Sequence, residues 1–212
     1  MPIPPESGPM HDPRSALLQH NSGRWAGCFI RLNPEGRELE RFPTQLDVRD
    51  TDGAIESRLT YLNSGQERAM AFRELPFTMQ VSPTGDWSLG PSAITPWSWV
   101  GELCVVRNGE RRRAIVRHGV KGLDGLVYVV ETLDASAPAL NEPLCSRIET
   151  SGTFTLWHPE PGVELLLDTR ARQSGDATAC GIRWRHPGGD VLQVVRRYDE
   201  GGQLLPLETT WP

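Results

Sequence analysis

The sequence lacks the long apolar run of about 20 residues that a membrane-spanning helix needs. Its first residues, MPIPP, lack the basic and apolar regions of a secretory signal peptide. A strong charge of one sign is missing too, because the net charge is only −5, which argues against a general binder of nucleic-acid backbones. We therefore expect a cytoplasmic protein that spans no membrane and binds no nucleic acid.

Disulfide and metal-binding patterns are also missing. The four cysteines lie far apart without a CxxC pair, so we expect free thiols that serve as small apolar residues. The five histidines form no HxH or HxxxH pair, and no metal site is expected. These residues are Cys28, Cys104, Cys145 and Cys180, and His11, His20, His118, His158 and His186.

Standard catalytic motifs are absent as well. The sequence holds no GxSxG nucleophile elbow, no P-loop, no GxGxxG motif after a strand and no HExxH zinc motif. Carboxylates are plentiful, but no pair has a spacing that by itself identifies a general acid and a general base. The motifs therefore leave open whether the protein is an enzyme.

What the sequence does have is a regular succession of turn signals between short runs rich in Val, Leu, Ile, Thr, Trp and Phe. Glycine and asparagine accept the positive φ of tight hairpins, and the runs are too short for most helices. Such a meander closes into a barrel or folds into a sandwich. We predict an all-β, antiparallel up-and-down meander closed into a barrel of about eight to ten strands, whose interior can hold one small ligand.

The chain is expected to form one domain over residues 12–212, preceded by a flexible, proline-rich segment at 1–11. Residues 86–98, rich in proline, tryptophan and serine, are expected to form a structured loop. Residues 134–150, rich in alanine, proline and asparagine, are expected to be a loop insertion.

One short helix is predicted over residues 13–21. Asp12 followed by Pro13 is typical of a helix start, and Asn21-Ser22-Gly23 ends the segment. The remaining runs predict strands at about 24–32, 38–42, 44–50, 54–62, 67–74, 77–81, 99–107, 110–118, 125–133, 152–157, 163–170, 177–185, 190–198 and 203–210.

A Gly-x-Trp pattern, Gly23 to Trp25, directly follows the expected helix and opens the first predicted strand. Lipocalin-type barrels begin in this way, with the helix at one end of the barrel and the tryptophan packed across it. A late arginine commonly covers that ring through a cation–π contact. The candidates here are Arg185, Arg196 and Arg197. The alternative is an ordinary core tryptophan beside a helix C-cap.

Asn108-Gly109 is the strongest hairpin signal in the chain. A two-residue loop puts Glu102 diagonal to both Arg113 and Arg117 on one face of the hairpin. Glu131, from the next strand, is in reach of the same face. This charged face points either to solvent or into the barrel. Inside the barrel the charges must be paired, and a free arginine fork would await a carboxylate.

Seven tryptophans are a generous number for a chain of this length. Flat aromatic walls suit a conjugated or lipid-like ligand. We expect Trp25, Phe29 and Trp99 to line the cavity of the barrel. The alternative, for any single tryptophan, is ordinary barrel core.

Several short motifs occur in an order that resembles a known family. From Gly23 to Pro43-Thr44 the chain reads Gly-x-Trp-x-Gly-x-Phe-x-Arg, a turn ending in Gly36, and then Pro-Thr. Further motifs are Trp87 to Pro91, Gly101-Glu102-Leu103, Arg111 to Val116, a strand ending in Glu131, Val194 to Asp199 and Leu207 to Thr210. On these motifs the chain resembles an uncharacterised lipocalin-like (calycin) domain family of cyanobacteria and plastid-bearing eukaryotes.

That family is similar in fold to the bilin lyases, which hold a linear tetrapyrrole in a calycin barrel and attach it to a cysteine of a phycobiliprotein. The resemblance therefore implies a calycin barrel, a bilin or other tetrapyrrole as the cofactor to test, and a phycobiliprotein subunit as the partner to test. This is an analogy between folds and does not establish an activity.

Three hypotheses follow. The first is binding of a small hydrophobic ligand that bears a carboxylate, oriented by Arg113, Arg117 and Glu102. The second is a chromophore lyase or barrel isomerase, in which Glu102 or Glu131 would handle a proton while arginine stabilises developing negative charge. The third is a structural or interaction module whose barrel is filled with side chains. An open cavity would distinguish the first two from the third.

Overall fold

The structure is a computed structural model that describes residues 11–95, 98–136, 142–207 and 210–211. The expected flexible N-terminus lies, except for its last residue, outside the described residues. The described part contains one helix and fourteen strands. It includes no helix with the length and apolar character that crossing a bilayer would take.

The helix α1 (Pro13–Asn21) has the bounds that the sequence predicts. The Asp12 side chain accepts hydrogen bonds from the backbone N–H of Arg14 and of Ser15, at 3.1 and 3.2 Å. It thereby satisfies two donors that a helix start leaves unpaired, and Pro13 has no N–H to satisfy. Cap and proline together fix where the helix begins.

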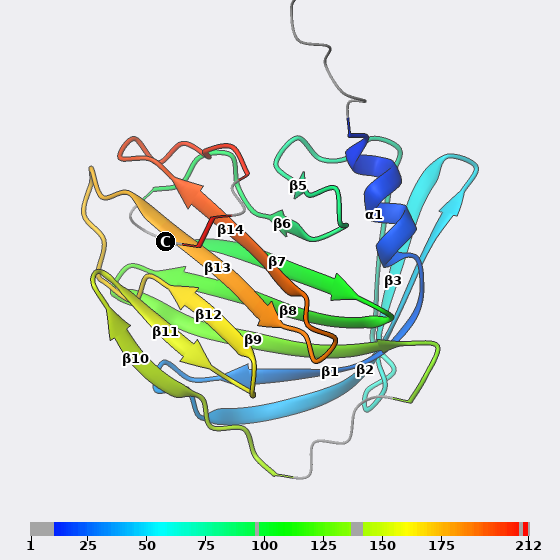
Figure 1. Cartoon of the computed structure of the whole chain (residues 1–212), viewed down its shortest axis with the longest axis horizontal. Coiled ribbons are helices and arrows are strands. Elements are labelled where there is room, and N and C mark those ends of the chain that lie inside the picture. The colour runs from blue at the N-terminus through cyan, green and yellow to red at the C-terminus, as the bar shows by residue number, and fades with distance from the viewer. Residues whose placement is uncertain (1–10, 96–97, 137–141, 208–209, 212) are drawn as a thin grey trace, which may run out of the picture.

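The first nine strands form one antiparallel sheet with the spatial order β4-β3-β2-β1-β9-β8-β7-β6-β5 (Figure 1). Each strand pairs with the next along the chain, except that β4 does not pair with β5, and the first strand pairs with the ninth. The strands are β1 (Gly23–Leu32), β2 (Glu38–Thr51), β3 (Ala54–Tyr61), β4 (Glu67–Phe72), β5 (Gln80–Val81), β6 (Trp87–Leu89), β7 (Trp99–Arg107), β8 (Glu110–Gly119) and β9 (Gly122–Leu133).

This sheet is a half-barrel, so the predicted closed barrel is wrong. The meander is present, but it stays open between β4 and β5 among the described strands. The strand expected at 77–81 shrinks to Gln80–Val81, and Phe77 is 84% exposed. Pro76, in the segment that joins β4 to β5, has no N–H to offer a neighbouring strand. Within the described part of the chain, no ladder of backbone hydrogen bonds joins β4 to β5. Apolar side chains lie in and beside this gap, among them Phe72, Leu75 and Met79.

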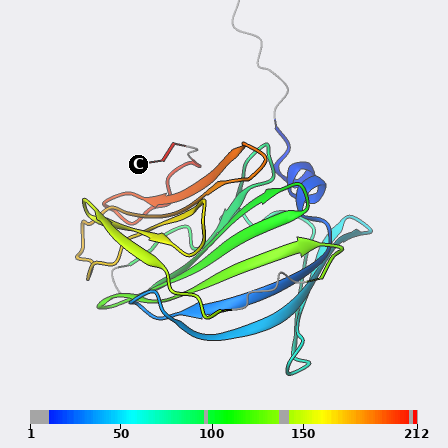
Figure 2. The same cartoon turned by 60° about the horizontal axis from the view of Figure 1, so that its bottom comes forward.

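The last five strands form a second antiparallel sheet in the order β10-β11-β12-β13-β14, instead of completing a barrel. Figure 2 shows this sheet, in yellow to orange, lying over the green strands of the half-barrel. Its strands are β10 (Arg147–Ser151), β11 (Phe154–His158), β12 (Val163–Leu167), β13 (Thr178–Arg185) and β14 (Val191–Tyr198).

The main core lies between the two sheets. It joins the outer face of β1 and β7–β9 to the second sheet, and Trp157, Leu165 and Ile182 are fully buried in it. The half-barrel contributes Leu103, Val105, Ala114, Val116, Tyr128 and Val130. Because side chains alternate along a strand, this burial of one face leaves the other face of the same strands turned inward. The fold is therefore half-barrel and sandwich at once.

Two loops expected from the sequence contain short strands. The structured loop at 86–98 includes β6, and residues 96–97 lie outside the described part. The C-terminal end of the loop insertion at 134–150 forms β10, and residues 137–141 lie outside the described part. At 203–210, the described residues form isolated bridges at Gln203 and Leu204 instead of a strand.

Arg196 on β14 joins the second sheet to the open side of the half-barrel. Its guanidinium, fully buried, donates to the carbonyls of Thr78 (3.0 Å) and Pro91 (2.8 Å). It also donates to the hydroxyls of Ser88 (3.2 Å) and Tyr198 (2.7 Å). Buried polar groups need partners, and here they come from three segments of the chain. This side chain holds the segments on either side of β6 against β14.

Asp86 organises the β5–β6 turn from within. The carboxylate is 3% exposed and accepts from the Val106 N–H (2.9 Å) and the Thr84 hydroxyl (2.8 Å). Burial raises its pKa to about 6, although these two hydrogen bonds and the charge of Arg107 oppose the shift. The folded protein therefore holds a proton on this carboxyl that the unfolded chain releases near pH 4.

Asp86→Asn is expected to stabilise the protein at pH 7.5 and to have little effect at pH 4. The pKa of Asp86 is higher in the folded than in the unfolded protein. Its contribution to the stability of the wild type is therefore fully present below pH 4. That contribution, about 3 kcal/mol at most, is lost as the pH rises to 6 and beyond. Asparagine cannot ionise, so the gain should grow with pH in urea unfolding experiments. Asp52→Asn, in an exposed turn, is the control, and a gain from Asp86→Asn that does not vary with pH would contradict the assignment.

Candidate functional site

The β7–β8 hairpin turns its charged face into the half-barrel. Asn108 and Gly109 have positive φ, 51° and 75°, and the strands pair in the predicted register, with Glu102 opposite Ile115. Leu103 and Val116, on the other face, are buried against the second sheet. Of the two orientations that the sequence left open, the structure has the one in which the charges point inward.

The inner face of the half-barrel surrounds a cavity of about 570 Å³. Residues of β3 and β4 face residues of β6–β8 across it, and α1 contributes from one end. Its apolar lining consists of Leu17, Phe29, Leu46, Val48, Ile55, Leu59, Tyr61, Ala69, Met70, Phe72, Pro76, Met79, Trp87, Leu89 and Ile115. Its polar lining consists of Asn21, Ser57, Arg68, Glu102, Arg111 and Arg113.

A buried ion cluster forms part of the cavity wall. Glu131 is fully buried, and its Oε2 accepts from the Nε of Arg111 (2.7 Å) and from the Nε of Arg113 (2.9 Å). Its Oε1 accepts from Nη2 of Arg113 (3.0 Å), whose Nη1 pairs with Glu102. Burial alone would raise the pKa of Glu131, but the two arginines outweigh it and lower the pKa. The carboxylate is therefore ionised and fully engaged.

Gly27 makes room for this cluster. It lies on β1 opposite Glu131, and a Cβ at position 27 would come within 2.6 Å of the Glu131 Cγ. The same Cβ would be 3.0 Å from the Thr44 hydroxyl on β2. The second glycine of the Gly-x-Trp-x-Gly motif thus leaves the space that the buried carboxylate fills.

Both arginines also lie over aromatic rings. The Arg111 guanidinium is 4.2 Å from the ring centre of Trp25, and that of Arg113 is 5.1 Å from Phe29. The prediction that Arg185, Arg196 or Arg197 covers Trp25 is wrong. Those three belong to β13 and β14 of the second sheet, which packs on the outer face, whereas Trp25 is on the inner face.

One arginine donor in the cluster is unused. Arg111 donates through Nε to Glu131 and through Nη1 to Asn21 (3.4 Å), but its Nη2 is buried without a hydrogen-bond partner. Asn21 is itself occupied, because its Oδ1 also accepts from the Trp87 indole (3.2 Å) and its amide donates to Gly85 O. A buried guanidinium N–H with nothing to donate to is costly, and a ligand oxygen would satisfy it.

The predicted site residues separate into two groups. Arg113, Glu102 and Phe29 line the cavity. Trp25 lies beneath Arg111, and Glu131 lies behind the two arginines. Arg117 is exposed near the end of β8, and Trp99 lies on the outer face, stacked on His118. Trp25, Arg117 and Trp99 are all missing from the lining residues of this cavity, although the sequence placed them in the site.

Among the polar lining residues that the sequence did not predict are Asn21, Arg68 and Arg111. For Arg111 a signal was present, because the Asn108-Gly109 turn and strand alternation place it on the face of Arg113. Asn21 and Arg68 reach the cavity only because α1 covers one end and β4 curls round to face β7 and β8. No local pattern in the sequence announces either contact.

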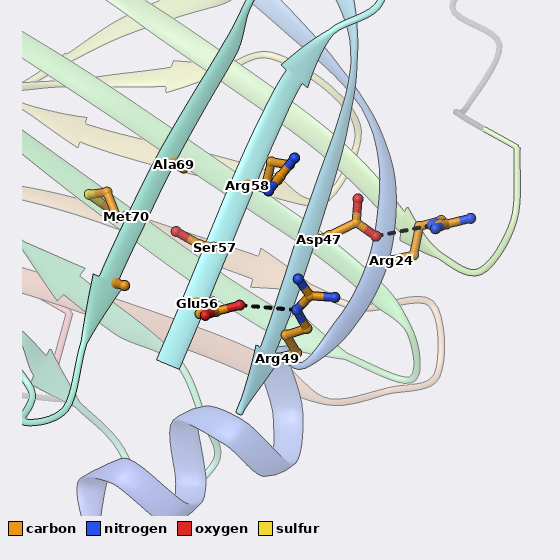
Figure 3. A pocket seen from close by; sticks show the side chains of 9 residues that line it. Arg24, Asp47, Arg49, Glu56, Ser57, Arg58, Ala69 and Met70 are labelled. Atoms are coloured by element: carbon orange, nitrogen blue, oxygen red, sulfur yellow. Dashed lines mark hydrogen bonds and ion pairs between the residues drawn. The ribbon is translucent and has the colours of Figure 1, made fainter. Parts of the chain in front are cut away.

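The outer face of β1–β4 carries a second, polar depression of about 540 Å³. Figure 3 shows two ion pairs on this face, Arg24 with Asp47 (3.0 Å) and Arg49 with Glu56 (3.2 Å). A third pair joins Arg58 to Glu67 (3.3 Å). These charges already pair with one another and are exposed to solvent. A ligand would therefore gain little interaction energy by replacing water in this depression.

The cavity offers no metal or thiol chemistry. Within the described ranges, no group of three His, Cys, Asp or Glu side chains could hold a metal ion. All four cysteines are free, as expected, and burial raises the pKa of the Cys104 thiol beneath the cluster. A thiol that stays protonated is a poor nucleophile.

Glu131→Gln is expected to lower the free energy of unfolding by about 3–5 kcal/mol, because two buried guanidiniums lose their carboxylate. Glu102→Gln is the matched variant at the solvent side of the cluster, where the carboxylate is partly exposed. It should cost less than about 1 kcal/mol. Urea unfolding at pH 7 measures both, and equal costs would show that burial of Glu131 is not what makes the cluster important.

The comparisons with known proteins agree with this division of the chain. A family model for a domain of unknown function (DUF3598), N-terminal, matches residues 10–136. That range spans α1 and the whole half-barrel, which is the part that surrounds the cavity. None of the curated proteins matches the chain.

One similar solved structure covers both sheets. It is a protein with unknown function from the DUF3598 family, from Nostoc punctiforme PCC 73102, with a TM-score of 0.74 and 17% sequence identity. The likeness spans 93% of this chain and 97% of that chain, and at this identity it establishes the fold alone. Since the family model matches more than half of the residues, the chain belongs to the DUF3598 family.

Proposed function

We propose that the half-barrel cavity binds a small hydrophobic molecule that bears a carboxylate. The observation that carries the proposal is the unused, buried Nη2 of Arg111 beside a cavity whose walls are mostly apolar. An ionised carboxylate is the partner that a guanidinium fork fits best. The cavity volume, about 570 Å³, falls within the range of about 300–1,000 Å³ that small-molecule sites occupy.

The charges of the cavity support a single anionic group. Three arginines, Arg68, Arg111 and Arg113, face two carboxylates, Glu102 and Glu131, which leaves one positive charge in excess. Arg68 has an aromatic neighbour, Tyr61, 5.8 Å from its guanidinium carbon. A monocarboxylic ligand would balance the excess, and its apolar body would replace water along the walls.

Access favours the side of β4. Met70 lines the cavity and yet is 61% exposed, and Arg68 beside it on the inner face is exposed too. The gap between β4 and β5 is bordered by side chains without backbone hydrogen bonds, so it is the part of the wall that opens at the lowest cost. An elongated ligand would enter here and place its carboxylate at Arg111.

The state of Glu131 weighs against the enzyme hypotheses. Both of its oxygens are bonded to arginines and its pKa is lowered, so it is a poor proton donor or acceptor. Glu102 remains as the carboxylate that faces the cavity and is partly exposed. The open cavity also disfavours a barrel filled with side chains. The kinship with bilin lyases stays a prediction, and a bilin is one of the ligands to test.

Binding is testable with cis-parinaric acid, a conjugated fatty acid whose fluorescence rises in apolar surroundings, and with biliverdin. The wild type should bind the acid saturably. Its affinity for the methyl ester should be at least about tenfold lower, because the ester cannot form a charge-assisted hydrogen bond to Arg111. Arg111→Lys should reduce this preference, since lysine keeps the charge but loses the fork. Equal affinity for acid and ester would contradict the role of Arg111.

Ser57→Trp and Arg58→Trp form a matched pair for the location of the site. Ser57 lines both the cavity and the polar depression, whereas Arg58, the next residue, lines the depression alone. Filling the cavity through Ser57→Trp should abolish binding of cis-parinaric acid, and Arg58→Trp should leave it unchanged. Binding that survives Ser57→Trp would place the ligand elsewhere and overturn the proposal.

A further inference from the structure

A second polar cluster lies on the opposite face of the half-barrel, away from the cavity. Trp99, at the start of β7, stacks on His118, near the end of β8, with ring centres 4.1 Å apart and planes 12° apart. The edge of Tyr198, on β14, meets the Trp99 ring at 5.1 Å. Arg172, from the segment between β12 and β13, lies within electrostatic reach of both His118 and Tyr198.

This cluster has an excess of unused hydrogen-bonding groups. The side chains of Trp99, His118 and Arg172 are at most 9% exposed. Five of their nitrogens are buried without a partner among the described residues: Trp99 Nε1, His118 Nδ1 and Nε2, and Arg172 Nε and Nη1. Leaving one such group unsatisfied destabilises the folded state, and a charged group does so more than a neutral one. Five such nitrogens on these three side chains require an explanation.

Arg172 also lacks a counter-charge. Its Nη2 donates to the carbonyl of Asp176 (3.1 Å), and no salt bridge reaches it from the described carboxylates. Asp168 is saturated, because it accepts from Arg170 at both oxygens and from the Thr178 hydroxyl (2.7 Å). The Asp176 carboxylate caps the backbone N–H of Gln173 (2.7 Å) instead.

The electrostatics agree with a place that is short of negative charge. Burial lowers the pKa of His118 to about 4, with Asp168 opposing the shift and Arg172 adding to it. Burial lowers the pKa of Arg172 as well, against the attraction of Asp168 and Asp176. A buried cation without a directly paired counter-charge is costly for the folded state. Water would satisfy hydrogen bonds here, but only an anion would neutralise the charge.

We propose that a small inorganic monoanion of the chloride type binds between the sheets, held by Arg172, His118 and Trp99. Arg172 supplies the charge and one of its free N–H donors, the Trp99 indole supplies a second donor, and one N–H of neutral His118 supplies a third. Because these donors are buried, the site suits a small ion rather than an organic carboxylate. The bound ion would join the segment that follows β12 to the ends of β7 and β8.

Crystals of the wild-type protein grown in sodium bromide test the site directly. The expected result is an anomalous bromide peak within hydrogen-bonding distance of the Arg172 guanidinium and the Trp99 indole. A map with no anomalous density there, at a bromide concentration that labels other positions, would overturn the proposal. This measurement needs no variant and therefore does not depend on whether one folds.

Thermal unfolding tests the same site in solution. At constant ionic strength, replacing sodium gluconate by sodium chloride should raise the Tm of the wild type saturably, by about 3 °C or more. Arg172→Met should abolish the chloride dependence, and Arg185→Met, which removes an exposed arginine from the neighbouring strand β13, should retain it. Equal Tm values in the two salts, or a chloride effect that survives Arg172→Met, would refute the anion site.

Discussion

The buried carboxylate of Glu131 between Arg111 and Arg113 is the interaction on which the half-barrel depends. It lies on β9, the strand that pairs with β1, and its ion pairs join β9 to β8. Gly27 supplies the space on one side, and the two arginines supply the charge on the other. Because those arginines also cover Trp25 and Phe29, the polar and aromatic parts of the wall hold one another in place.

The second sheet explains why such charges can face inward. The outer face of the β7–β8 hairpin is apolar, with Leu103, Val105 and Val116 fully buried against β12–β14. That burial anchors the strands from outside and supplies the hydrophobic stabilisation that a barrel usually obtains from its interior. The inner face therefore does not have to form the main core, and it can contain an open cavity and an ion cluster.

Local features of the fold were predictable from the sequence. The N-cap and proline fixed α1, and the Asn108-Gly109 turn fixed the register of β7 and β8. Strand alternation could even have excluded Trp99 from the cavity, because it lies three residues before Glu102 and so on the other face of the same strand. Arg111 could have been found by the same reasoning, from its pairing with Glu131 across β8 and β9.

Long-range features were not predictable. Either face of the β7–β8 hairpin satisfies alternation, and only the position of the second sheet decides which one is covered. The open seam between β4 and β5 arises in the segment around Pro76, where the sequence pattern of 77–81 alternates like a strand but Phe77 points to solvent. The half-barrel and the second sheet also share the same turn chemistry, so nothing local separates one meander into two sheets.

Arg196 gives the C-terminal third of the chain a part in the cavity without lining it. The whole cavity wall comes from the range that the family model matches, residues 10–136, yet the carbonyls of Thr78 and Pro91 within that range are held by a guanidinium from β14. Residues 10–136 therefore provide the whole lining of the cavity, but the backbone at its edge is held partly by a residue from outside that range. Any homologue that exchanged its last strands would have to supply an equivalent clamp or accept a looser rim around the cavity.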